Sequence, residues 1–176
     1  TFLILGGSYW GADSLDRDAP WIQADNPEKG LAIREAMSLA INREIILDRI
    51  LGGYGELNYA PVFQYNNNPG LMDPSWKLPE YNVELAKQKL AEGGYPDGFE
   101  ITLFMYPDDI DLPGVGEAIA GMWEEIGIKV NRQPGDEGIL DEKLDKQDTA
   151  GLAWVKLAKT RPEPASTISN YRMANT

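Results

Sequence analysis

Carboxylates are the main candidates for chemistry in this chain, because histidine and cysteine are both absent from its 176 residues. Without these two residue types the chain has no thiolate nucleophile, no imidazole base and no disulfide, and it cannot build the usual zinc sites. Carboxylates can still bind calcium or, as a pair, hydrolyse a glycosidic bond. The composition therefore leaves two kinds of chemistry to look for.

A calcium site is the first possibility, because Asp108, Asp109 and Asp111 form a D-D-x-D cluster before Pro113. A calcium loop needs further oxygen ligands and a closing glutamate at a set spacing, and Glu117 does not fall there. We expect a solvated turn and predict no metal site.

A carboxylate-based hydrolase is the second possibility, because positions 136 to 148 contain six acidic residues. On a helix Asp141 and Asp145 share one face, and Lys143 and Lys146 interleave with the acidic row and screen its charge. No apolar pocket is indicated that would raise one carboxyl pKa for acid catalysis. We therefore interpret this row as a solvated helix surface and predict that the chain is not an enzyme.

Two glycine-rich spots, at positions 52–55 and 114–116, lack the spacing of phosphate-binding loops, so we predict helix ends and turns there and no cofactor. The formal charge of −12 makes binding to a nucleic-acid backbone unfavourable. No apolar run approaches the roughly 20 residues that cross a bilayer. The composition thus indicates a globular chain without nucleic-acid partners.

The order of apolar runs and turn residues predicts an α/β fold with helices packed on a sheet. Asn26, Asn42 and Asn82 precede three helical patterns as capping residues, and Gly52 and Gly53 end the second of them. Strands are expected at 1–7, 99–105, 128–132 and 151–157, and helices at 27–41, 43–51, 83–92, 116–126 and 138–146, with a proline-rich loop from Tyr54 to Glu80.

Helical spacing of apolar residues predicts which helix faces are buried. The first helix should bury Ile33, Met37 and Ile41, the second Ile45, Ile46, Ile50 and Leu51, and the helix near 116–126 should bury Ile119, Met122, Trp123 and Ile126.

The segment REAMSLAINREIILDRILGGYG, from Arg34 to Gly55, is followed by LAKQKLAEGGYPDGFEITL and MWEEIGIKV. This succession resembles the family 5 extracellular solute-binding proteins, the peptide- and nickel-binding subunits of bacterial ABC importers. The resemblance extends roughly over Thr1 to Ser166 and is strongest from Arg34 to Val130. It implies one lobe of a type II periplasmic-binding-protein fold, with a mixed sheet and packed helices.

A length of 176 residues suits a single domain. Members of the family are much longer and have two lobes, so we expect residues 1–176 to be one domain, an excised second lobe whose first lobe is missing. The resemblance implies capture of a peptide or another small solute between the lobes and delivery to permease subunits in the membrane. It also implies a periplasmic or extracellular location, either free or anchored as a lipoprotein.

The same fold also occurs as the ligand-sensing domain of cytoplasmic transcription regulators, and this alternative stays open. A helix-turn-helix before Thr1, in place of a signal peptide, would favour it.

The stretch Gly151 to Pro164 resembles the family segment that leaves a central strand at the cleft between the lobes. Open α/β sheets bind ligands outside the carboxyl ends of their strands, which places Tyr106, Gln133, Trp154 and Lys156 near the cleft. Trp154 would supply a flat apolar wall, and Lys156 and Arg161 would pair with an anionic group such as a peptide carboxylate.

A structural interpretation of these residues is equally open, with Trp154 in the core of a buried strand and Arg161 on a surface turn. In oligopeptide-binding relatives this segment offers an aspartate to the amino terminus of the ligand. Here residues 157–160 are Leu, Ala, Lys and Thr, so the sequence departs from that pattern.

Overall fold

The computed structural model describes residues 2–7, 16–57, 77–105 and 112–156. Within these ranges a four-stranded sheet has the order β1-β4-β2-β3. Its strands are β1 (Phe2–Leu5), β2 (Glu100–Met105), β3 (Lys129–Pro134) and β4 (Leu152–Lys156). Strand β2 runs parallel to both β3 and β4, whereas β1 pairs with β4 in the antiparallel direction. The mixed sheet predicted from the sequence is thereby confirmed.

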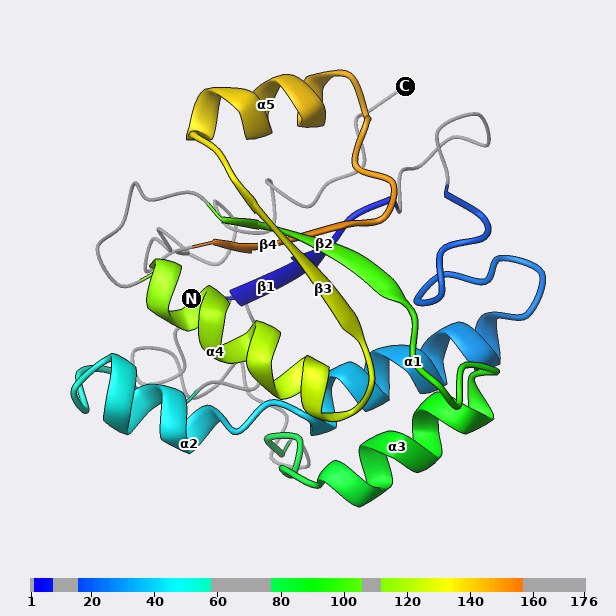
Figure 1. Ribbon diagram of the computed structural model, residues 1–176, viewed down its shortest axis with the longest axis horizontal. Coiled ribbons are helices and arrows are strands. Elements are labelled where there is room, and N and C mark those ends of the chain that lie inside the picture. The colour runs from blue at the N-terminus through cyan, green and yellow to red at the C-terminus, as the bar shows by residue number, and fades with distance from the viewer. Residues whose placement is uncertain (1, 8–15, 58–76, 106–111, 157–176) are drawn as a thin grey trace, which may run out of the picture.

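Helices lie on both sides of this sheet (Figure 1). One side carries α1 (Pro27–Leu39), α2 (Arg43–Ile45), α3 (Val83–Glu92) and α4 (Leu112–Glu125), and the other carries α5 (Glu137–Asp145). The described core contains Ile33, Met37, Leu103 and Trp123, all at most 2% exposed, where α1 and α4 meet the sheet. Trp123 fixes this contact further, because its Nε1 donates to the Met37 carbonyl oxygen at 3.0 Å.

The three helix starts predicted after Asn26, Asn42 and Asn82 are confirmed, although the capping contacts differ. Asn42 and Asn82 accept from the backbone N–H of Ile45 and Leu85 at 3.0 and 2.9 Å. Asn26 occupies the same position before α1, but its side chain forms no capping hydrogen bond. Pro27 and Glu28 therefore mark the start of α1 without help from that amide side chain.

The predicted burial of the second helix is partly wrong. After α2 the chain continues as the π-helix η1 (Ile46–Ile50), in which Leu51 N–H donates to the Ile46 carbonyl oxygen at 3.1 Å. Ile46 is buried, but Ile45 is 50% exposed. Ile45 is the last residue of α2, and the helix changes to π geometry directly after it, so one α-helical spacing over residues 43–51 does not describe the buried face.

Candidate functional site

The carboxyl ends of three parallel strands meet at one edge of the sheet. Met105 of β2 pairs with Pro134 of β3, and Phe104 of β2 pairs with both Gln133 and Trp154. Gln133 therefore lies one residue before the end of β3, and Lys156 is the last residue of β4. Two of the predicted ligand residues thus lie on strands that end at this edge, which is where an open α/β sheet binds its ligands.

Trp154 and Gln133 also share one face of the sheet. The strand pairings join Ile4, Trp154, Phe104 and Gln133 into one row across all four strands. Directly paired residues project to the same face, and their neighbours along each strand project to the other. The row consequently lies opposite the α4 side, where Leu103 and Val155 project.

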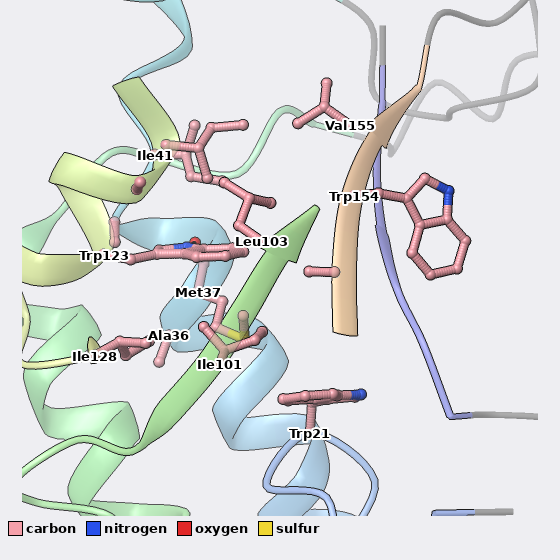
Figure 2. Packing of buried hydrophobic residues seen from close by; sticks show 14 of the residues in the cluster. Trp21, Ala36, Met37, Ile41, Ile101, Leu103, Trp123, Ile128, Trp154 and Val155 are labelled. Carbon is pink, nitrogen blue, oxygen red and sulfur yellow. The ribbon is translucent and has the colours of Figure 1, made fainter. Parts of the chain in front are cut away.

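Trp154 is a buried member of this row. Its side chain is 5% exposed and belongs to the apolar core. Figure 2 shows its indole on the far side of β4 from Leu103, Met37 and Trp123. The structure therefore matches the core placement that was one of the two interpretations from the sequence. A contact between Trp154 and a ligand stays a prediction.

The other predicted ligand residues are described less fully. Lys156 pairs with Phe2 in the backbone register of β4 and β1. Gln133 is half-buried on β3. Tyr106, Arg161 and the cluster of Asp108, Asp109 and Asp111 lie outside the described residues. Their proposed roles in ligand or metal binding stay predictions.

An ion-pair cluster fixes the carboxyl half of β3 to α4. Arg132 precedes Gln133 and projects from the opposite face of the sheet. Its guanidinium contacts a Glu117 oxygen at 2.8 Å and the two Glu124 oxygens at 2.6 and 3.1 Å. These hydrogen bonds raise the pKa of Arg132 and lower the pKa of Glu124. The sequence analysis missed this cluster, although the spacing of Glu117 and Glu124 along one helix face was a signal for it.

The acidic row near α5 is a solvated surface, as predicted. Asp136 caps the helix by accepting from Ile139 N–H at 2.9 Å, and Asp141 and Asp145 are exposed. Lys146 forms an ion pair with Glu142, and the hydrogen bond between them lowers the pKa of that carboxyl. Within the described part of the chain, no group of three or more acidic residues is arranged to hold a metal ion.

The mixed sheet, the helices on both of its faces and the shared carboxyl-end edge define one α/β lobe of a binding-protein fold. Comparison with known proteins agrees. The chain belongs to family 5 of the bacterial extracellular solute-binding proteins, because the model for the middle region of that family matches residues 17–174.

Two curated relatives illustrate the range of the family. The oligopeptide-binding protein AppA of Bacillus subtilis is 37% identical over 139 residues, which cover 71% of this chain and 25% of AppA. Heme-binding protein A of Haemophilus influenzae is 30% identical over 111 residues, which cover 60% of this chain and 19% of that protein. The chain thus spans about a fifth to a quarter of the length of the curated relatives it matches.

Solved structures agree on the fold. AppA in complex with a nonapeptide matches with a TM-score of 0.58 and 25% identity, over 88% of this chain and 32% of AppA. A dipeptide-binding protein from Pseudoalteromonas sp. SM9913, in complex with Met-Leu, matches with a TM-score of 0.65 and 22% identity, over 81% of this chain and 28% of that protein. Among the described helices of this chain, none has the length and apolar character required to cross a membrane.

Proposed function

We propose that this chain is one lobe of the solute-binding component of an ABC importer, and that the whole protein captures a peptide or another small solute for delivery to membrane permease subunits. One observation carries the proposal. In a chain of the family 5 solute-binding proteins, Gln133 and Lys156 lie where the carboxyl ends of three parallel strands meet. Ligands of open α/β sheets bind at such an edge.

Peptides are the proposed solute class. AppA is named as an oligopeptide-binding protein, and the Pseudoalteromonas structure contains Met-Leu. The relatives reported above are all named for binding, and none of them is named as an enzyme or as a regulator. We therefore assign this chain to binding without chemical conversion, in preference to a hydrolase or a transcription regulator.

The proposed site consists of Tyr106, Gln133, Trp154, Lys156 and Arg161 at this edge of the sheet. Lys156 and Arg161 would neutralise a peptide carboxylate, and Gln133 would donate or accept hydrogen bonds through its amide. The other wall of the cleft would come from the first lobe of the same protein. Closure of the two lobes then follows from the greater affinity of the solute for the closed state.

The first experiment is native mass spectrometry of the full-length protein purified without added ligand, followed by denaturation and identification of any released molecule. A released peptide supports the proposal. Release of a different small molecule would contradict peptides as the solute class but would still support capture of a solute.

Substitution tests the place of the site, with Met-Leu and trialanine as probe peptides in calorimetry. Lys156→Ala should weaken peptide binding, whereas Lys129→Ala, at the amino end of β3, should leave it unchanged. Equal affinity of the two variants would move the site away from the carboxyl-end edge. Failure of both probes to bind the wild-type protein would contradict a peptide-binding function.

The location proposed for the whole protein is the periplasm or the cell exterior, with a lipoprotein anchor as one form of attachment. The description of the family as extracellular supports it. Cell fractionation with a cytoplasmic marker enzyme tests it, and recovery of the protein with that marker would favour the regulator alternative.

A further inference from the structure

The three tryptophans of the described core differ in one respect. Trp21 donates from Nε1 to the Gly6 carbonyl oxygen at 2.9 Å, and Trp123 donates to that of Met37 at 3.0 Å. Trp154 is also buried, with 5% of its side chain exposed. Among the described residues, however, its indole N–H has no hydrogen-bond acceptor. A buried indole N–H ordinarily has an acceptor, because an unpaired buried donor is costly.

The orientation of the indole indicates where its acceptor would lie. In Figure 2 the ring nitrogen of Trp154 lies on the side of the indole that faces the carboxyl end of β4, and the six-membered ring lies on the other side. The same edge holds Gln133, which shares the row of Trp154 and Phe104. The unpaired donor therefore points toward the proposed binding edge and not toward the helices α1 and α4.

We propose that Trp154 Nε1–H is a hydrogen-bond donor to the bound solute and that it selects solutes with a carbonyl or carboxylate oxygen at this position. The proposal rests on the proposed function, which it makes more specific. An indole N–H donates and cannot accept, so it excludes a ligand that presents an ammonium or another donor there. A peptide supplies the required oxygen from its backbone or its carboxyl terminus.

This assignment changes the role expected for Trp154. The sequence suggested a flat apolar wall, but a side chain that is 5% exposed offers little ring surface to a ligand. A single directed hydrogen bond needs far less exposed surface than stacking does. The ring of Trp154 packs in the core, and its N–H supplies the contact.

The test uses Trp154→Phe in the full-length protein, refolded to remove any co-purified solute, with Met-Leu as the probe. Phenylalanine keeps an aromatic ring and removes the N–H group. Affinity should fall about threefold to tenfold, the range for one hydrogen bond. The matched control Trp123→Phe removes an N–H that already has an acceptor within the protein, so it should lower the melting temperature and leave the affinity within about twofold.

Nuclear magnetic resonance of the wild-type protein supplies a second readout that does not depend on a variant. The indole ¹H–¹⁵N signal missing from the Trp154→Phe spectrum identifies Trp154. Addition of Met-Leu should shift that signal downfield and slow its exchange with water, as expected for a new hydrogen bond. The indole signals of Trp21 and Trp123 should change less.

Three results would overturn the inference. Equal affinity of Trp154→Phe and the wild-type protein would overturn it alone and leave the proposed function standing. A Trp154 signal already protected from exchange without solute would show that another part of the protein supplies the acceptor. Absence of Met-Leu binding to the wild-type protein would overturn the proposed peptide function and this inference with it.

Discussion

At the scale of single residues, Thr149 joins the end of β1 to the start of β4. Its side chain is fully buried, and its hydroxyl oxygen accepts from the Gly7 backbone N–H at 3.0 Å. Beside it, Gly6 N–H donates to the Leu152 carbonyl oxygen at 2.7 Å. The hydroxyl thereby satisfies a backbone donor that would otherwise be buried without a partner.

Substitution of this hydroxyl should destabilise the fold. Thr149→Val keeps the shape of the side chain and removes the acceptor, so the free energy of unfolding should fall by about 1 to 3 kcal/mol. Urea denaturation measures it. The control is Thr102→Val on β2, where the half-buried side chain forms no hydrogen bond among the described residues; we expect a change within about 0.5 kcal/mol. Similar losses at both positions would show that the Thr149 hydroxyl is unimportant.

The ion pair of Glu124 should give stability a pH dependence. Its hydrogen bonds to Arg132 hold the folded-state pKa of the Glu124 carboxyl below its ordinary value, so the folded state binds its proton less readily than the unfolded state. The stabilisation is present above the unfolded-state pKa and is lost as the pH falls through the folded-state pKa.

Melting temperatures between pH 7 and pH 3 test this dependence. Glu124→Gln should melt below the wild type at pH 7, and the gap should close as the pH falls. Glu125→Gln, at a neighbouring exposed position without an ion pair in the described structure, should show a smaller gap. A constant gap for Glu124→Gln across this range would contradict the prediction.

The residue types and the predicted strand ends were enough to predict that Gln133 and Lys156 lie at the carboxyl-end edge of the sheet, where open α/β sheets bind ligands. The sequence could not decide between a buried and a ligand-facing Trp154, because the burial depends on the pairing of β4 between β1 and β2. Arg132 was missed for the same reason, since its partners lie on a helix whose contact with β3 exists only in the folded chain.

At the scale of elements, the two asparagines before α1 and α3 offer a matched comparison. Asn82 caps α3 through its side chain, whereas Asn26 forms no such bond. Asn82→Ala should lower the free energy of unfolding by about 1 kcal/mol, and Asn26→Ala should cost clearly less. Thermal unfolding followed by circular dichroism measures both. A larger loss for Asn26→Ala would reverse the assignment of the caps.

The turn before β2 depends on close backbone contact. Gly98 has φ of +80°, and a side chain on it would overlap the carbonyl oxygen of Gly127 at the turn before β3. Gly98→Ala should therefore cost more than about 1 to 2 kcal/mol, the strain of the left-handed conformation alone. The control is Gly121→Ala, at an exposed position of α4. Nothing lies near the added methyl group there, so stability should rise by about 0.5 to 1 kcal/mol. Chemical denaturation measures both, and a neutral Gly98→Ala would contradict this account.

Hydrophobic spacing predicted the helices and strands because each buries one regular face. It was wrong where the local geometry changes, as at the junction of α2 and η1, where Ile45 is exposed. The helix α4 begins at Leu112, before the predicted position 116, because Pro113 is compatible with a first helical turn. Strand β3 continues to Pro134, beyond the predicted position 132, because a proline is tolerated at the end of an edge strand.

At the scale of the whole molecule, the proposed function predicts that this chain alone binds weakly. A solute held between two lobes contacts only one of them here. The 176-residue chain, once shown to be folded by circular dichroism, should bind Met-Leu at least about tenfold more weakly than the full-length protein, which corresponds to about 1.4 kcal/mol. Calorimetry compares the two. Sub-micromolar binding by the chain alone would contradict the need for a second lobe.

The pairing of β1 with β4 has a consequence for how the protein is made. Strands β2 and β3 are separated by about 30 residues and can pair early, whereas Phe2 pairs with Lys156 across a loop of about 150 residues. During synthesis the apolar strand Phe2–Leu5 leaves the ribosome long before its partner exists. The strand Phe2–Leu5 therefore has no partner while the roughly 150 residues up to β4 are synthesised, and its apolar side chains are exposed to aggregation during that interval.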